Sequence, residues 1–586
     1  MTYVRDAFPQ SRPELNRDSR ALWIDPPPRA NGVQSLHDDP LIDALLARRF
    51  TDPQEAQDFL DSRSRPAPDP HRLPGMSEAA ERIAHALRRG EQIGIFGDYD
   101  TDGVTSAALL THALRAASGE VQPVSVRLPL RREGYGLSEK GVEDLAAAGA
   151  TLLIAVDCGS RDHAAVARAR QQGMDVVILD HHRLIEPPPR EAIVASAQLR
   201  DDAPYRNVSA AGLAYLLATA LAQDNFDCGD GQTNEPVGLL DLAMIGLVGD
   251  VSSLTGVNRP LVRDGLRRFR GQTRPGLRAL CDVAAIAPGS VSSTEIAFQV
   301  SPRLNAPGRL GDPRTAYELL VTDDARSATK LAGHAEAANQ KRKQLLGRIL
   351  RDVATMLATN PSHLERRVLV LVGKDWEAGI VGLAASKLSE QFDRPVIVLT
   401  VADGVASGSA RSVPGFDITD ALSSVAGLLL RYGGHERAAG LALREIQLSA
   451  LDDALQDAIA RSPAAPPGPT RLVIDAELDA EQLRIQTVQR IQTLGPFGEG
   501  NPVPLLRVSR LPVRGYTVMG REKQHLKILT AGPAGYVDAL LWSGANRSSE
   551  LLGARHVDIV GYLESNVWNE TARAQIRVAD FRPSVE

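Results

Sequence analysis

Three short segments of the sequence gather acidic side chains and histidines. They read GDYDTDG at 97–103, DCGS at 157–160 and DHH at 180–182, and they contain Asp98, Asp100, Asp102, Asp157, Asp180, His181 and His182. No Lys or Arg lies inside them, so these carboxylates would repel by several kcal/mol if they met. Bound divalent cations would remove that repulsion, and carboxylates with some imidazole suit Mn²⁺ or Mg²⁺. Two such ions about 3.5–4 Å apart, bridged by a carboxylate, are typical of enzymes that hydrolyse phosphate esters.

Each segment follows a short apolar run that predicts a β-strand, at residues 93–96, 152–156 and 176–179. Helical patterns at 104–116 and 164–172 separate the runs, and this alternation predicts a parallel α/β sheet. The carboxyl ends of parallel strands share one edge, where ligands bind. We therefore expect the acidic and histidine side chains to converge there.

Each segment taken alone also has a structural interpretation. A single Asp after a strand, such as Asp157 or Asp180, is often a helix N-cap. A DxDxD loop is also found as a calcium turn or a solvated surface, and adjacent histidines usually lie on the surface. The combination of three such segments at equivalent strand ends favours the metal site.

The rest of the 586-residue chain divides into further units by pattern. The long segment 322–360 contains no proline and is basic, which predicts a connecting helix. The linker SPAAPPGPT at 462–470 precedes a strand-rich region typical of a small β-barrel. The expected units are a helical lead-in at 1–75, an α/β domain at 76–321, the connecting helix at 322–360, a second α/β domain at 361–461 and a barrel at 462–586.

Composition indicates a folded, soluble protein of the reducing cytoplasm. The net charge is −6, charged residues make up 24% and hydrophobic residues 43%. We expect no membrane span and no signal peptide, and the three cysteines show no CxxC spacing. Residues 505–555 contain eight Lys and Arg against three Asp and Glu, so the expected barrel is locally basic, at +5.

The three segments resemble the motifs of the DHH phosphoesterase superfamily, and Gly249-Asp250-Val251 is similar to its fourth acidic motif. Further motifs resemble the RecJ family of single-strand-specific DNA exonucleases. They are SPRLNAPGRLGD at 301–312, GSARS at 408–412, YGGHERAAG at 432–440 and GPFGEGNP at 495–502. The resemblance implies a DHH domain, a DHHA1 domain and an OB-fold barrel. Two departures are Glu377, where the family commonly has His, and a shorter loop that leaves the choice between Arg131 and Arg132 open as the phosphate contact.

The resemblance implies roles for the acidic residues. The metal ligands it implies are Asp100, Asp102, His181 and Asp250, and we add Asp98 and also Asp157, whose place at the end of a central strand gives it access to both ions. Asp157 is expected to bridge two ions, and Asp98 is either a ligand or an outer group. Asp180 is expected to orient an imidazole or accept a backbone bond, and His182 either contacts the scissile phosphate or protonates the leaving 3′-oxygen.

Contacts to the substrate are expected from three regions. Ser409 and Arg411, on one face of a strand, would bind a 5′-phosphate, and His435 lies in a Gly-Gly loop that could approach an anion. The expected contacts to the strand are Arg131, Arg303, Asn305 and Arg309, although a structural ion pair is an alternative for Arg303 and Arg309. On the barrel, Phe497, Tyr516 and Trp542 either stack on bases or pack in the core.

The residues themselves predict metal-dependent phosphoryl chemistry. The resemblance implies that the chain is a 5′→3′ exonuclease that degrades single-stranded DNA to 5′-mononucleotides by two-metal hydrolysis, in DNA repair and recombination. One alternative is a phosphodiesterase of nanoRNA or cyclic dinucleotides, which would not need the basic barrel. Another is a non-catalytic replication scaffold, which the complete set of Asp and His ligands disfavours. The resemblance also implies a monomer that works with a single-strand-binding protein and a RecQ-type helicase.

Overall fold

The computed structural model describes residues 21–26, 35–61, 68–119, 124–228, 236–460, 471–520, 522–533, 535–568 and 571–584. The first twenty residues, the linker at 462–470 and Arg521 lie outside the described residues. The chain forms two compact units. The first unit consists of Asp61–Gln340 and Leu494–Val503, and the second contains the described residues up to Leu60, Lys341–Thr493 and Pro504 onward.

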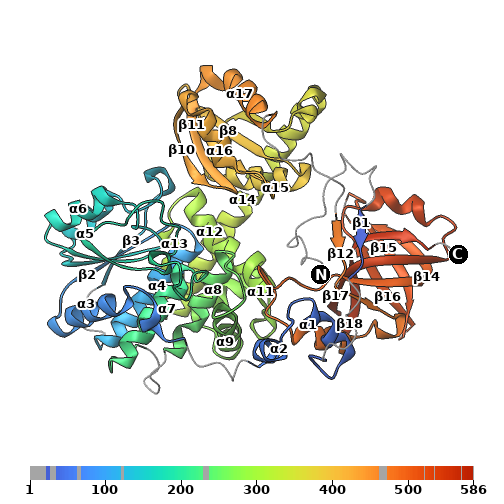
Figure 1. Cartoon of the computed structure of the whole chain (residues 1–586), viewed down its shortest axis with the longest axis horizontal. Helices are drawn as coiled ribbons and strands as arrows, with labels where there is room; N and C mark the ends of the chain where they lie inside the picture. Colours follow the sequence, from blue (N-terminus) through green and yellow to red (C-terminus); the bar gives the residue numbers. More distant parts are fainter. Residues whose placement is uncertain are drawn as a thin grey trace. The chain divides into compact units, whose positions relative to one another are not determined.

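The first unit contains a five-stranded sheet in the order β3-β2-β4-β5-β6, and every neighbouring pair is parallel (Figure 1). This confirms the α/β sheet expected from the sequence. Its strands are β2 (Ile93–Gly97), β3 (Val124–Arg127), β4 (Leu152–Val156), β5 (Asp175–Leu179) and β6 (Ala192–Ala195).

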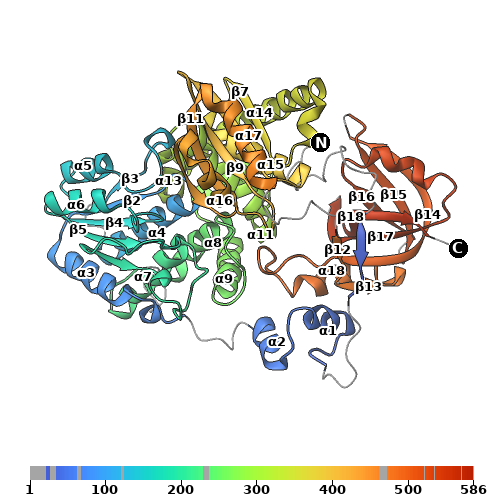
Figure 2. The same cartoon turned by 45° about the horizontal axis from the view of Figure 1, so that its top comes forward.

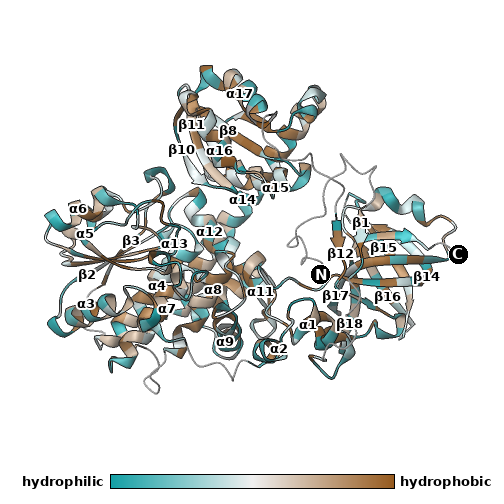
Figure 3. Cartoon of the chain, viewed as in Figure 1, coloured by the Kyte–Doolittle hydropathy of each residue, from teal (hydrophilic) through white to brown (hydrophobic). Residues whose placement is uncertain are grey.

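Helices cover both faces of this sheet, and alternation along β4 shows why. Leu152, Ile154 and Val156 belong to one apolar cluster, whereas Leu153 and Ala155 belong to another. Figure 3 shows the central strands in brown, as expected for strands buried on both faces. Helices α3 (Met76–Arg89), α4 (Thr101–Ala117) and α7 (Ala210–Gln223) supply the first cluster, and α5 (Glu139–Ala147) and α6 (His163–Gln171) supply the second.

A helical region follows the sheet in the same unit (Figure 2). Helix α8 is buried from Leu240 to Val248, which agrees with its apolar residues on all sides except for Asp241. A π-helical turn, Ile296–Val300, leads directly into α12. The helices are α8 (Leu240–Gly249), α9 (Asn258–Gly271), α10 (Pro275–Ala284), α11 (Ser293–Glu295), α12 (Ser301–Leu310) and α13 (Arg314–Val321). Helix α14 (Ala325–Thr359) lies within the expected connecting segment and belongs to the first unit up to Gln340 and to the second from Lys341.

The second unit contains a mixed sheet in the order β10-β11-β9-β8-β7, in which β7 and β8 are parallel and the other pairs antiparallel. The Gly-Gly segment expected as a loop is instead part of β10, because Gly433 and Gly434 pair with Gly440 and Ala439 of β11. The elements are β7 (Leu369–Lys374), β8 (Val396–Ala402), β9 (Val405–Arg411), β10 (Leu429–His435), β11 (Ala438–Arg444), α15 (Ala378–Phe392), α16 (Ile418–Ser424) and α17 (Leu448–Ala460).

The strand-rich region forms a closed barrel in which β14, β15, β16, β18 and β17 pair in turn and β17 pairs back with β14. This confirms the expected barrel. The strands are β14 (Leu506–Met519), β15 (His525–Gly532), β16 (Gly535–Leu541), β17 (His556–Trp568) and β18 (Thr571–Pro583), with β13 (Ala476–Leu478) beside β14 and α18 (Ile485–Gln492) before it.

The lead-in expected to be helical contains α1 (Pro40–Ala47) and α2 (Pro53–Leu60), and also a short strand, β1 (Leu22–Ile24). β1 pairs in parallel with β12 (Arg471–Val473). Trp23 donates a hydrogen bond to Asp580 of the barrel at 2.7 Å, and Arg582 stacks over its ring. Among the described residues, no helix is long and apolar enough to cross a bilayer.

Candidate metal centre

The three acidic segments meet at the carboxyl-terminal edge of the parallel sheet, as the topology requires. Three overlapping groups of potential ligands form there, and within each group the ligand atoms lie within 4.8 Å of one another. The groups are Asp98, Asp100 and Asp157; Asp157, His181 and His182; and Asp102, His181 and Asp250. Every expected ligand therefore belongs to at least one group.

The loop after β2 presents its carboxylates through the start of α4. Asp100 is the N-cap of α4, and its Oδ1 accepts hydrogen bonds from the backbone N–H of Asp102 and Gly103 at 2.9 and 3.2 Å. A Cβ on Gly103 would lie 2.5 Å from the backbone nitrogen of Asp98, so only glycine permits this tight turn.

Asp102 is buried against the start of another helix. Its carboxylate accepts hydrogen bonds from the Ser209 hydroxyl and the backbone N–H of Ala210 and Ala211, at 2.7–3.0 Å. One of its oxygens also lies 3.8 Å from Nε2 of His181. Since a carboxylate has about four lone-pair positions, this anchoring leaves room for a cation.

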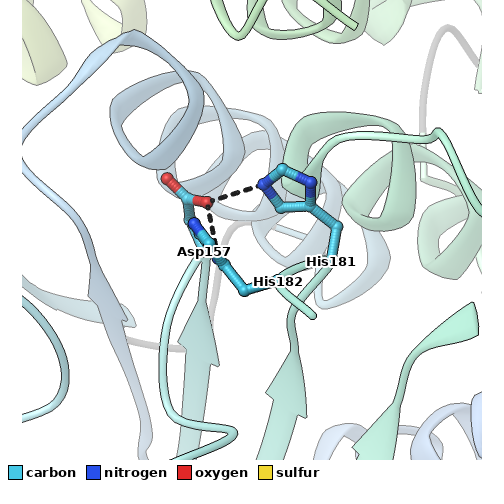
Figure 4. Close-up of side chains that lie close together, drawn as sticks. All are labelled: Asp157, His181 and His182. Atoms are coloured by element: carbon cyan, nitrogen blue, oxygen red, sulfur yellow. Dashed lines mark ion pairs between the residues drawn. The ribbon is translucent and has the colours of Figure 1, made fainter. Parts of the chain in front are cut away.

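Asp157 and the two histidines face one another (Figure 4). Asp157 Oδ1 lies 3.3 Å from His181 Nε2 and 3.9 Å from His182 Nδ1. Asp157 adopts a left-handed backbone conformation with φ of 63°, which is uncommon outside glycine and clusters at functional sites. Asp250, the C-cap of α8, reaches the same place, with one oxygen 3.9 Å from His181 Nδ1.

The electrostatics of these carboxylates reflect crowding. Burial is the largest cause, and neighbouring carboxylates add to it, so the pKa of Asp98, Asp102 and Asp157 lies well above the ordinary value. Burial also lowers the pKa of His181, which favours the neutral imidazole that metals bind.

The donor set fits a divalent cation. Oδ1 of Asp98 and Nε2 of His181 are buried and have no hydrogen-bond partner in the part of the chain that the structure describes. Orphaned buried polar atoms are costly, and cations bound in the ligand groups that contain these residues would satisfy them. Oxygen ligands with one imidazole suit Mn²⁺ or Mg²⁺.

Asp180 holds His182. Its Oδ1 accepts from the backbone N–H of His182 at 3.1 Å and lies 2.8 Å from Nδ1, and its Oδ2 accepts from Ser160 N–H. Burial alone would raise the pKa of Asp180, but these bonds lower it to about 2. Burial alone would lower the pKa of His182, but the bond to Asp180 raises it. His182 is therefore protonated at a higher pH than a free imidazole.

The residues expected to contact the strand in the first unit differ in environment. Arg131 stacks over the Tyr99 ring at 4.2 Å, beside the acidic loop, whereas Arg132 is exposed, and this favours Arg131 as the contact. Arg303 is buried in an ion pair with Glu336 at 2.6 Å, which favours the structural alternative.

Two further expected contacts lie in α12. Asn305 is half-buried and accepts a hydrogen bond from Thr101 N–H, so its side chain faces the acidic loop. Arg309 is half-buried near the end of the helix.

The expected phosphate pocket lies on β9 in the second unit. As the i, i+2 spacing predicts, the side chains meet, and Arg411 donates to the Ser409 hydroxyl at 2.5 Å. Arg411 also donates to the Ser386 hydroxyl of α15. A Cβ on Gly382 would lie 3.4 Å from both Ser409 Oγ and Arg411 Nη2. His435 is exposed at the end of β10.

The basic barrel is partly neutralised by its own acids. Arg507, Lys527 and Arg547 form ion pairs with Glu477, Asp538 and Glu550 respectively. Exposed cations remain at Arg510, Arg514, Lys523 and Arg555.

Of the expected stacking residues, Tyr516 is exposed and Trp542 packs edge-on against His525. Phe497 belongs to the first unit, where its carbonyl accepts from Ser293, so the expectation that it lies on the barrel was wrong.

Sequence reasoning gave no role to Tyr135, whose hydroxyl lies 3.0 Å from His182 Nε2 and donates to the Asp157 carbonyl oxygen. The sequence did contain a sign of this residue, because Tyr135 stands between two glycines, Gly134 and Gly136, in the loop that also contains Arg131 and Arg132. Sequence reasoning also gave no role to Gly382, although it lies in the same family-like segment as Glu377, or to Ser386, for which the sequence offered no sign.

Three family models match the chain. They are the DHH family N-terminal domain at residues 92–247, the DHHA1 domain at 365–461 and the RecJ OB domain at 474–580. The fold and the acidic centre thus define a phosphoesterase of the DHH class with a second α/β domain and an OB barrel.

Individual relatives agree. The single-stranded-DNA-specific exonuclease RecJ of Bacillus subtilis is 31% identical over 94% of this chain and 68% of its own length. The protein of the same name from Thermus thermophilus is 34% identical over 87% of this chain and 71% of its own length. A crystal structure of RecJ from T. thermophilus in complex with Mn²⁺ matches with a TM-score of 0.78 and 30% identity, over 97% of this chain and 80% of that one. The chain belongs to the RecJ family.

Proposed function

We propose that this chain is a metal-dependent exonuclease that degrades single-stranded DNA from the 5′ end to 5′-mononucleotides, in DNA repair and recombination. The observation that carries the proposal is the meeting of three ligand groups at the edge of the parallel sheet. The RecJ OB domain supports a long single-stranded substrate rather than a small nucleotide. The relatives named single-stranded-DNA-specific exonuclease support the same substrate.

The residues proposed to hold two Mn²⁺ or Mg²⁺ ions are Asp98, Asp100, Asp102, Asp157, His181 and Asp250. When bound, such ions activate water and neutralise the charge that develops on the phosphate. Asp157 belongs to two of the three groups, which supports its proposed role as the bridging ligand.

The chain's own proton chemistry centres on His182. Asp180 fixes the imidazole through Nδ1 and raises its pKa against the effect of burial. We propose that His182 either contacts the scissile phosphate or donates a proton to the leaving 3′-oxygen. Asp180 acts through His182 and orients it.

Substrate contacts are proposed at three places. Arg131 and Arg309 would hold the backbone near the acidic loop, Ser409 and Arg411 would bind the 5′-phosphate, and His435 lies on the same sheet. On the barrel, exposed cations and Tyr516 would extend the contact.

We keep the division at 75, 321, 360 and 461 as the proposed domain boundaries. From the family resemblance, we also propose a cytoplasmic monomer whose partners are a single-strand-binding protein and a RecQ-type helicase.

The test uses end-labelled single-stranded and duplex DNA with Mn²⁺, Mg²⁺ or EDTA. We expect mononucleotides released from the 5′ end of single strands only, and only with metal. Cleavage that persists in EDTA, or that starts equally at both ends, would contradict the proposal. Cleavage confined to dinucleotides would instead favour a small-nucleotide phosphodiesterase.

A further inference from the structure

Helix α12 holds the loop that carries three of the proposed metal ligands. Oδ1 of Asn305 accepts a hydrogen bond from the backbone N–H of Thr101 at 2.9 Å. The Thr101 hydroxyl in turn donates to the carbonyl oxygen of Ser301 at 3.2 Å. Thr101 lies between Asp100 and Asp102, so both bonds act directly on the acidic loop.

Asn305 completes the N-terminal cap of α4. The first N–H groups of a helix have no partner within the helix. Asp100 accepts those of Asp102 and Gly103, and Asn305 accepts that of Thr101. Thr101 is 1% exposed, so water cannot readily replace Asn305 as the acceptor.

The helix approaches the loop as closely as its backbone allows. A Cβ on Gly308 of α12 would lie 2.4 Å from the carbonyl oxygen of Tyr99. Helix α8 approaches the same loop, since a Cβ on its last residue, Gly249, would lie 2.6 Å from the Thr101 side chain. On its other side, α12 is anchored by Arg303, which pairs with Glu336 and donates to the Gln299 carbonyl. The side-chain oxygen of Asn305, which accepts the bond from Thr101, is therefore held at a fixed place relative to the loop.

We propose that Asn305 is a positioning residue of the metal centre, which fixes Asp100 and Asp102 for the cation by accepting the Thr101 N–H. The inference rests on the proposed function in that it takes these carboxylates as ligands. It replaces the expectation that Asn305 contacts the DNA strand, because the side-chain oxygen is engaged by the loop.

The two roles differ in what they change. A strand contact affects the KM for DNA and leaves metal affinity intact. A positioning residue affects metal affinity and kcat and leaves the KM for DNA nearly unchanged. Loss of an outer group that orients metal ligands typically costs about 10–100-fold in metal affinity.

The experiment titrates Mn²⁺ into the full metal-free chain by calorimetry, without DNA. Asn305→Leu keeps the side-chain size but removes the acceptor, and Asn305→Asp keeps an acceptor oxygen. The matched control is Thr111→Val, because Thr111 is buried in the same helix α4 and its hydroxyl donates to the Ala107 carbonyl, away from the loop. Asn305→Ala takes the place of Asn305→Leu if the latter does not fold by circular dichroism.

We expect Asn305→Leu to weaken Mn²⁺ binding by about 10–100-fold, Asn305→Asp to restore most of it, and Thr111→Val to bind like the wild type. Wild-type affinity in Asn305→Leu, or equal losses in all three variants, would overturn the inference. A raised KM for DNA with intact Mn²⁺ affinity would also overturn it, in favour of the strand contact. Absence of exonuclease activity in the wild type would count against the proposed function alone, because the titration contains no DNA.

Discussion

Neutralising Asp157 should stabilise the metal-free protein and at the same time abolish stabilisation by metal. The ligand atoms of Asp98, Asp100 and Asp157 lie within 4.8 Å of one another. At that separation and an effective dielectric constant of about 20, two ionised carboxylates repel by about 3.5 kcal/mol. These three carboxylates form three pairs, and Asp157 takes part in two of them. Asn accepts the left-handed backbone of this position, where φ is 63°, so Asp157→Asn removes charge with little backbone cost.

The full repulsion is not recovered, because the folded protein relieves part of it by holding protons. Burial and the neighbouring carboxylates raise the pKa of Asp157, and each pKa unit corresponds to about 1.4 kcal/mol. We therefore expect Asp157→Asn to gain about 1–3 kcal/mol at pH 8 in EDTA. A domain of this size shifts its Tm by about 2–4 °C per kcal/mol, which thermal unfolding resolves. Mn²⁺ at about 100 times its Kd should add about 2.7 kcal/mol to the wild type and nothing to the variant.

The matched control is Asp241→Asn in the same unit. Asp241 is also buried, but it pairs with Arg274 at 2.7 Å. Removing one partner of a buried ion pair costs about 3–5 kcal/mol, so this variant should lose stability both with and without metal. If Asp157→Asn lowers the Tm in EDTA as Asp241→Asn does, the carboxylates do not repel one another and the argument for a cation fails.

Three further outcomes are expected. Burial and crowding raise the pKa of Asp98 and Asp157, so the stability of the metal-free protein falls as the pH rises above about 4. The Tm gain from Mn²⁺ should therefore be larger at pH 8 than at pH 6, and equal gains would contradict this. Asp180 raises the pKa of His182, so Asp180→Asn should move the alkaline decline of kcat to lower pH, and an unmoved pH profile would remove Asp180 from this role. Arg411→Ala should reduce the rate ratio between 5′-phosphorylated and 5′-hydroxyl strands while cleavage itself continues, and an unchanged ratio would exclude the pocket.

Regular elements with strong local patterns were predictable from the sequence. The apolar run at 152–156 is β4 residue for residue, because Thr151 and Asp157 bound it with polar groups. The strand ends predicted the convergence of the acidic segments, since parallel topology alone brings them together. By contrast, the sequence indicated only a strand-rich region after residue 470 and not the extent of β14, which continues to Met519 through exposed positions without a clear period.

Long-range partners were not predictable. Nothing local to Arg303 shows that Glu336, 33 positions later, will bury its charge. The glycines of β10 concealed a strand, because glycine weakens the local strand signal while the pairing partners in β11 lie elsewhere in the sequence. The hydrogen bond from Thr101 N–H to Asn305, 204 positions away, could not be predicted for the same reason.

The structural and the chemical interpretations of the acidic residues turn out to be compatible. Asp100 caps α4, Asp102 accepts the first N–H groups of α7, and Asp250 ends α8, so the ends of three helices fix the carboxylates that crowd together. A substitution at Asp102 therefore disturbs a helix as well as a ligand. Asp157 caps no helix among the described residues, and its carboxylate faces His181 and His182. Removing the charge at Asp157 should therefore abolish metal binding without disturbing a helix. Asp102→Asn should lose metal binding and also weaken the start of α7.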